Sequence, residues 1–390
     1  MRARTEAWYR GELLLSLVAA VWLLTDQSAW AQAPAGSLGQ EKISSERMEE
    51  IYRKILLDWA AGETDRAPDE LIQLETGVIV DGEPKTRKTL FEAEQRVIHQ
   101  VGTADLEVLV PISVLHHEAY RRLLERRTRG EAVAMVHTRR MARDLAVLYY
   151  EQSGSEGAAL VTSRVLTSLG GMLLQSAQQL PAAEMFQQAV DLDGHNTAAL
   201  LGLASIYEKN AQAESAVKIL RRALEAEPGN AEAKLRLALN LKRLDQAGEA
   251  EKLLGELVAA TDPSWVTPLG FQELARLHSD RGRTSEAEKV LRKGVERFPN
   301  DPRLKIQLAA VLDRRGAAGE ATAIVEKLLA SPSLSAATDA SDRFLYNTVR
   351  PEAFEPARSF LAENSKSRLP VLAQALSAPA EASTGTGVGR

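Results

Sequence analysis

The sequence contains no cysteine, and this absence narrows the chemistry open to the chain. Without thiols there are no disulfides, no thiolate metal sites, no cysteine nucleophile and no lipidated cysteine of the bacterial lipoprotein kind. Aromatic residues are also scarce, at 5% of the chain, and alternating runs of Val, Ile and Thr are almost absent. The segment from Gly77 to Gly82 is the one candidate for a short strand or turn.

Alanine and leucine dominate instead, beside Glu, Lys and Arg, and these residue types lose little free energy on entering a helix. The chain is 45% hydrophobic and 26% charged, which is typical of a folded globular protein. Its net charge of −5 is mild and excludes no class of partner. We therefore predict an all-α protein.

The N-terminal segment 1–31 has the pattern of a cleavable signal peptide. A basic segment (Arg2, Arg4 and Arg10) precedes the apolar run Leu13–Leu24, and small residues lead to a predicted cleavage after Ala31. An apolar run of this length is shorter than the roughly 20 residues that span a bilayer. We expect a periplasmic or secreted protein with no later membrane-spanning segment. Residues 32–42 are predicted to be a flexible linker and residues 377–390 a disordered tail.

A pattern of small and large apolar residues repeats every 34 positions along residues 163–335, with about three extra residues near Asp262–Thr267. The clearest copy spans residues 197–230 and contains Leu200, Leu203, Ala204, Tyr207, Ala216, Leu220, Ala223 and Pro228. In these residues the chain resembles the tetratricopeptide repeat (TPR) family, in its bacterial exported form. The resemblance places five units at 163–196, 197–230, 231–267, 268–301 and 302–335. It implies a right-handed superhelix of helix pairs, with turns inside two units at Gly282 and Gly316.

In this family the first helices of the units line a concave groove. Carried over by register, the resemblance predicts a partner-binding set of Leu201, Ser205, Glu208, Leu235, Leu239, Lys242, Gln272 and Arg276. Leu201 and Leu235 occupy the position where carboxylate-clamping relatives have Lys, so that clamp is not reproduced. A mixed apolar groove with a basic rim suits an extended or helical protein segment. The alternative is that Leu235 and Leu239 only pack between helices.

Residues 43–160 are predicted to form an N-terminal helical region. Ser45 begins a capped amphipathic helix, and two further helices around Ile112–Leu124 and Met141–Tyr149 form an antiparallel hairpin that caps the repeats. Within residues 336–376, Asp342–Ala362 and Arg368–Leu376 are expected to close the other end of the array.

The densest group of candidate metal ligands is His116-His117-Glu118, followed by His137. Adjacent histidines point about 100° apart on a helix, so they do not reproduce the His-Glu-x-x-His arrangement of a metalloprotease. A zinc site of His117, His137 and Glu118 is one interpretation. Histidines at the surface or packed between helices are the other, and we predict no metal and no cofactor.

A basic stretch over residues 118–143 predicts a face of Arg121, Arg122, Arg126, Arg139, Arg140 and Arg143. Such a face could meet an acidic partner or anionic lipid. It could equally be a solvated face whose arginines pair with the acidic segment 41–80.

The sequence thus predicts a non-enzymatic scaffold that binds an unidentified protein or peptide in its TPR groove, and no nucleic acid. Two alternatives stay open. One is a peripheral membrane adaptor that uses the arginine-rich face, and the other is a hydrolase or metal enzyme in residues 43–160.

Overall fold

The computed structural model describes residues 44–80, 84–126, 132–261, 264–329 and 355–377. These residues form helices joined by turns, with no strand among them, so the predicted all-α class is confirmed. The strand or turn predicted at 77–82 is wrong, because the helix α3 (Ala67–Val80) continues through its first four residues. The predicted signal peptide, the linker and residues 378–390 lie outside the described part of the chain.

The chain divides into two compact units. The first comprises residues 1–176 together with 354–390, and the second comprises residues 177–353. The boundary therefore falls inside the first predicted repeat, 163–196.

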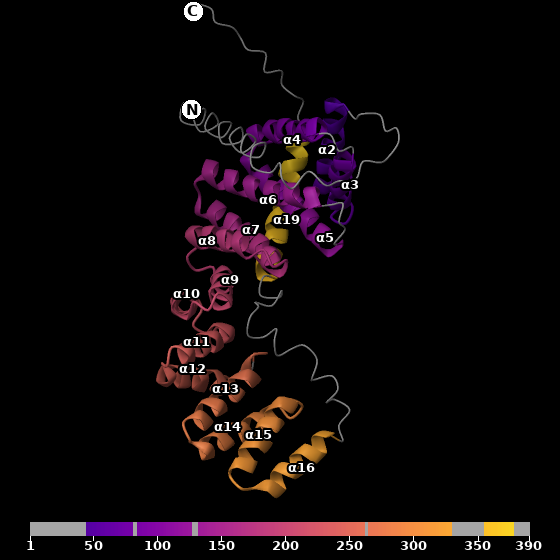
Figure 1. Ribbon diagram of the computed structural model, residues 1–390. Helices are drawn as coiled ribbons and strands as arrows, with labels where there is room; N and C mark the ends of the chain where they lie inside the picture. The colour runs from indigo at the N-terminus through magenta and orange to yellow at the C-terminus, as the bar shows by residue number, and fades with distance from the viewer. Residues whose placement is uncertain (1–43, 81–83, 127–131, 262–263, 330–354, 378–390) are drawn as a thin grey trace, which may run out of the picture. The chain divides into compact units, whose positions relative to one another are not determined.

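The first unit is built from long helices (Figure 1). They are α2 (Ser45–Ala60), α3, α4 (Pro84–Ala104), the short 3₁₀ helix η1 (Leu106–Val108), α5 (Leu109–Arg126), α6 (Ala132–Ser153), α7 (Glu156–Gln175) and α19 (Glu355–Ser377).

The predicted hairpin is present, because α5 and α6 pack against each other. The helix α2 is capped as predicted, but one residue earlier, since the Ser44 hydroxyl accepts a hydrogen bond from the amide of Arg47. Its buried face then carries Met48, Tyr52 and Ile55.

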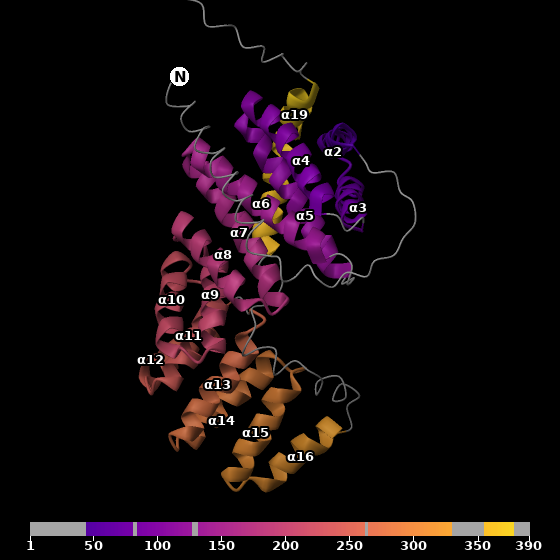
Figure 2. The ribbon, with the colours of Figure 1, turned by 45° about the horizontal axis from the view of Figure 1, so that its top comes forward.

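The C-terminal helix was assigned wrongly from the sequence. Residues 355–377 form the single helix α19, which packs against α2, α5 and α7 of the first unit and does not close the repeat array. Both views show it in yellow among the purple helices of that unit (Figure 2). Ala357, Leu361 and Leu372 are its most deeply buried apolar residues.

Among the described residues, α7 is long and apolar enough to span a membrane, contrary to the expectation from the sequence. In its most apolar window, 78% of the residues are buried inside the structure. It is therefore a core helix of the first unit.

The second unit contains shorter helices of 12 to 14 residues. They are α8 (Gln179–Leu192), α9 (Thr197–Lys209), α10 (Ala213–Ala226), α11 (Ala231–Arg243), α12 (Ala247–Ala259), α13 (Thr267–Asp280), α14 (Thr284–Arg297), α15 (Pro302–Arg314) and α16 (Ala318–Leu329). From α9 onward they pack in consecutive pairs that coincide with the predicted units 197–230, 231–267, 268–301 and 302–335.

A residue with left-handed backbone conformation lies in the turn inside each helix pair. Positive φ recurs once in every helix pair, at Ala177, Ala211, Asp245, Gly282 and Gly316. The amide after the left-handed residue bonds back to a carbonyl five residues earlier, as from Gln212 to Tyr207 and from Arg283 to His278. These are Schellman caps, which satisfy the last carbonyls of each first helix. The spacing between successive turns is constant except from Asp245 to Gly282, where the longer interval contains the predicted insertion near residues 262–267.

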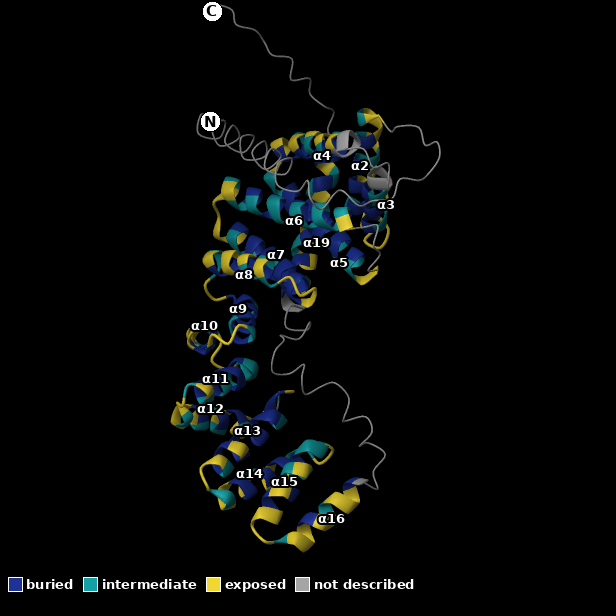
Figure 3. Cartoon of the chain, viewed as in Figure 1, coloured by how far each residue is buried: buried dark blue, intermediate teal, exposed yellow. Residues whose placement is uncertain are grey.

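Burial follows the pairing, with dark-blue faces turned toward neighbouring helices (Figure 3). The closest approach involves Gly202 on α9, where a Cβ atom would lie 2.5 Å from the ring of Phe186 on α8. Glycine is therefore required there for the two helices to pack.

Candidate functional site

The first helices of the repeats place several of the predicted groove residues around one hollow. Glu208 of α9, Leu235 and Leu239 of α11 and Leu269 of α13 line it, beside Trp265 just before α13. The hollow is shallow, with a volume of about 20 Å³, so it suits an inserted side chain rather than a small-molecule ligand. Trp265 is 41% exposed, so part of its apolar side chain is open to a partner at the edge of this hollow.

A buried ionic network forms the polar wall of this hollow. The Glu208 carboxylate accepts hydrogen bonds from Arg236 Nη2 at 2.8 Å and from Asn240 Nδ2 at 2.7 Å. Arg236 also donates to Glu232 at 3.2 Å. Burial alone would lower the pKa of Arg236, but Glu208 and Glu232 raise it above its usual value. The network fixes α9 against α11 with its charges largely compensated.

The other predicted groove residues divide between rim and core. Lys242 donates to Glu273 at 2.8 Å, and the exposed Arg276 lies 3.7 Å from the same carboxylate. Leu201, Ser205 and Gln272 are buried in the described structure. The predicted set is thus partly a surface and partly a helix-packing core, whereas Leu235 and Leu239, for which packing was the alternative, line the hollow.

The arginine-rich face is largely paired with carboxylates. Arg122 lies 3.2 Å and Arg126 2.5 Å from Asp69 of α3. Arg121 bonds Glu118 and Glu125, and Arg143 bonds Asp144. These contacts include the predicted pairing with the acidic segment 41–80.

Two of these arginines, Arg121 and Arg122, line a pocket of about 550 Å³ between α2, α5 and α19. Arg358 and Lys366 also line it, and Trp59 and Leu369 belong to its apolar lining.

The first histidines of the group pack between helices, which is one of the two interpretations that the sequence left open. His116 and His117 are both buried, and their side chains serve different clusters. His117 Nε2 lies 2.8 Å from the Ser168 hydroxyl, and burial lowers the pKa of His117 to about 4. Glu118 bonds Arg121 and Arg122. The zinc set of His117, His137 and Glu118 is therefore not brought together.

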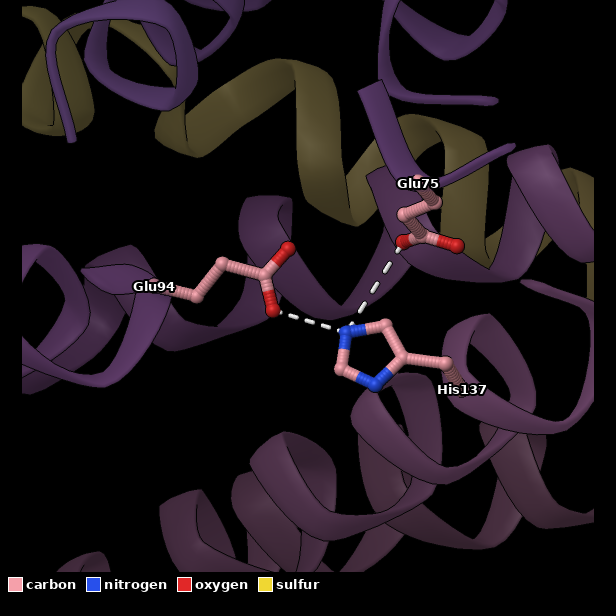
Figure 4. Close-up of side chains that lie close together, drawn as sticks. All are labelled: Glu75, Glu94 and His137. Carbon is pink, nitrogen blue, oxygen red and sulfur yellow. Dashed lines mark hydrogen bonds and ion pairs between the residues drawn. The ribbon is translucent and has the colours of Figure 1, made fainter. Parts of the chain in front are cut away.

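His137 instead meets Glu75 and Glu94, two carboxylates that the sequence analysis did not single out (Figure 4). Its Nε2 lies 2.7 Å from Glu94 Oε2 and 3.9 Å from Glu75 Oε1. Burial would lower the pKa of His137, but these carboxylates raise it to about 9. Burial raises the pKa of Glu75 well above its usual value, and the Glu94 charge adds to that effect.

The geometry of the second unit defines a class of protein: a solenoid of antiparallel helix pairs with a hollow on its first helices. Family models of the tetratricopeptide repeat match residues 181–227, 209–265 and 268–311. Within residues 181–311 the chain therefore has the tetratricopeptide repeats that the sequence predicted.

Individual relatives are distant. Cellulose synthase 1 operon protein C of Komagataeibacter xylinus is 28% identical over 123 residues, which are 28% of this chain and only 9% of that protein. A tetratricopeptide repeat protein from Parabacteroides merdae has a TM-score of 0.39 at 18% identity, covering 66% of this chain and 93% of its own. PilF of Pseudomonas aeruginosa has a TM-score of 0.40 at 16% identity, covering 57% and 93%. At these scores the solved structures carry no argument about function.

Proposed function

We propose that the first helices α9, α11 and α13 hold a partner protein by inserting one of its apolar side chains beside Trp265. The observation that carries the proposal is the hollow itself, which is lined only by first-helix residues and the segment that leads into α13. An exposed tryptophan next to the half-buried Leu239 is the composition of a binding hot spot. The neighbouring ionic network keeps the wall of the hollow rigid, which reduces the entropy lost on binding.

The charges around the hollow favour an acidic partner. Glu208 and Glu232 share one cation, Arg236, while Glu273 is shared by two, Lys242 and Arg276, so these charges balance. Arg243, at the edge of the hollow, is exposed and donates to Asn240, an uncharged residue. The bound segment therefore combines an apolar anchor with a nearby Asp or Glu.

The location of this activity is part of the proposal. The basic segment, short apolar run and small residues before position 31 support export from the cytoplasm. N-terminal sequencing of the mature chain is the direct test, and a mature chain that begins at Met1 would contradict it.

The binding surface can be tested with a displayed peptide library and the full mature chain. We expect selected peptides to share an apolar residue near an acidic one, and Leu239→Asp to weaken their binding at least tenfold. Val325→Asp is the matched control, because Val325 is a 41% exposed apolar residue on α16, the second helix of its pair. Equal binding by Leu239→Asp and Val325→Asp proteins would refute the assignment of the hollow.

A further inference from the structure

Four helices of the first unit each direct one ligand-type side chain to a common point in its core. Glu75 comes from α3, Glu94 from α4, His116 from α5 and His137 from α6. Glu75, Glu94 and His116 are fully buried, and the His137 side chain is 12% exposed. Polar side chains this deep are rarely gathered without a partner that compensates for their lost hydration.

The spacing of their atoms matches one small cation. Ligand atoms of Glu75, Glu94 and His137 all lie within 4.8 Å of one another. His116 Nδ1 lies 3.7 Å from Glu75 Oε1, which in turn lies 3.9 Å from His137 Nε2. Four ligands at about 2.0 Å in a tetrahedron are about 3.3 Å apart, and the separations of 2.7, 3.7 and 3.9 Å within the cluster lie close to that value.

The cluster has acceptors that the protein leaves unused. Both oxygens of Glu75, one oxygen of Glu94 and Nδ1 of His116 are buried without a hydrogen-bond partner among the described residues. The other nitrogen of His116, Nε2, lies 3.0 Å from the Tyr52 hydroxyl. When Nε2 donates to that hydroxyl, Nδ1 presents a lone pair toward Glu75 Oε1, and two acceptors face each other.

The charges of the cluster are also compatible with a metal ion. Two ionised carboxylates with one imidazolium would leave a net negative charge in an apolar interior, which is costly, so the cluster without a metal requires Glu75 to be protonated. One divalent cation with two carboxylates and two neutral imidazoles is electrically balanced. Two nitrogen and two oxygen ligands from buried side chains suit Zn²⁺ in a closed, four-coordinate structural site.

We propose that Glu75, Glu94, His116 and His137 bind one Zn²⁺ ion that ties α3, α4, α5 and α6 together. The Tyr52 hydroxyl orients His116 from behind, as hydrogen-bond partners of metal-bound histidines do. His137, the one partly exposed member, marks the side from which the ion enters. This site lies in the first unit and is separate from the function proposed for the repeats.

The test is metal content and spectroscopy of the full mature chain. Protein stripped with a chelator and dialysed against Zn²⁺ should retain one equivalent, and its thermal midpoint should rise by about 5 °C or more. Replacement by Co²⁺ should give the intense visible absorption of a tetrahedral site. Less than a tenth of an equivalent of Zn²⁺ would overturn the proposal.

Two variants locate the ion. Glu75→Gln keeps the volume and removes a buried charge, so the chain should still fold while its Zn²⁺ affinity falls at least about 100-fold. Tyr52→Phe should weaken binding by about tenfold through His116. The control is His117→Gln, a buried neighbour that faces Ser168 and should leave Zn²⁺ binding unchanged. Undiminished binding by Glu75→Gln protein would show that any metal lies elsewhere and would refute this site.

Discussion

The turn inside each helix pair contains a residue with positive φ, and this residue is alanine in one pair and glycine in another. Exchanging the two residue types tests the effect of backbone conformation on stability. Ala211 has φ of 56° and is exposed, so its methyl group contributes no packing. Gly282 occupies the corresponding turn with φ of 72°, and a Cβ atom added there would meet nothing within 4 Å. The two turns make the same pair of backbone bonds. Exchanging alanine and glycine therefore tests backbone conformation almost alone.

Two opposing effects determine how much each substitution changes the free energy of unfolding. An L-residue in the left-handed region costs roughly 1–2 kcal/mol. Replacing alanine by glycine removes this cost, but it also raises the conformational entropy of the unfolded chain, which offsets about 0.4–1 kcal/mol of the stabilisation. Ala211→Gly should thus stabilise the second unit by about 0.5–1 kcal/mol, and Gly282→Ala should destabilise it by a similar amount.

Urea unfolding can be followed in this unit by the fluorescence of Trp265, the tryptophan of residues 177–353. A Trp59→Phe background removes the signal of the tryptophan that lies in the described part of the first unit. The two variants should shift the midpoint in opposite directions with the same slope. A loss of stability in Ala211→Gly protein, or none in Gly282→Ala protein, would refute the conformational explanation.

Two further predictions concern packing and charge in the same unit. Gly202→Ala should lower the free energy of unfolding by about 1–3 kcal/mol, because its methyl group would overlap Phe186. Gly255→Ala, in open space within α12, should raise it by about 0.5–1 kcal/mol in the same urea assay. Hydrogen bonds from Arg283 lower the pKa of Glu251, so this carboxylate stabilises the folded state above its unfolded pKa and ceases to do so as the pH falls through its folded pKa. Glu251→Gln should therefore lower the urea midpoint at pH 7 and have little effect near pH 3. The control Glu225→Gln, at an exposed position, should have little effect at either pH. An equal decrease of the urea midpoint of Glu251→Gln protein at both pH values would contradict the ion-pair explanation.

The repeats could be predicted because their information is local. Each helix pair buries the same small and large positions, so the period and even the insertion near residue 265 are visible in the sequence. Trp265 was missed because it lies in that insertion, outside the repeating pattern. The left-handed turns at Ala177, Ala211 and Asp245 were also missed, since only glycine signals such a turn by its identity.

The cluster of Glu75, Glu94, His116 and His137 could not be predicted because its information is not local. These residues are far apart in the sequence and come from four separate helices, so no spacing rule connects them. Two adjacent buried histidines also give no indication of which one joins the cluster. His116 lies beside Glu75, while His117 lies beside Ser168 of α7. Only the packing of the first unit decides between them.

Because α19 belongs to the first unit, the repeats are connected to that unit at both of their ends. Because residues 355–377 complete the core that residues 44–176 begin, the repeat array is an insertion between α7 and α19 rather than a C-terminal extension. Arg368 bonds Glu107, and Glu107 also accepts from the Tyr149 hydroxyl, so α19 is joined to η1 and α6 by a polar network as well as by apolar packing. The first unit therefore cannot complete its core until the array has been synthesised. An ion that ties α3, α4, α5 and α6 together would stabilise the incomplete core during that interval. This gives a closed metal site a physical role in a chain whose proposed binding surface lies in its other unit.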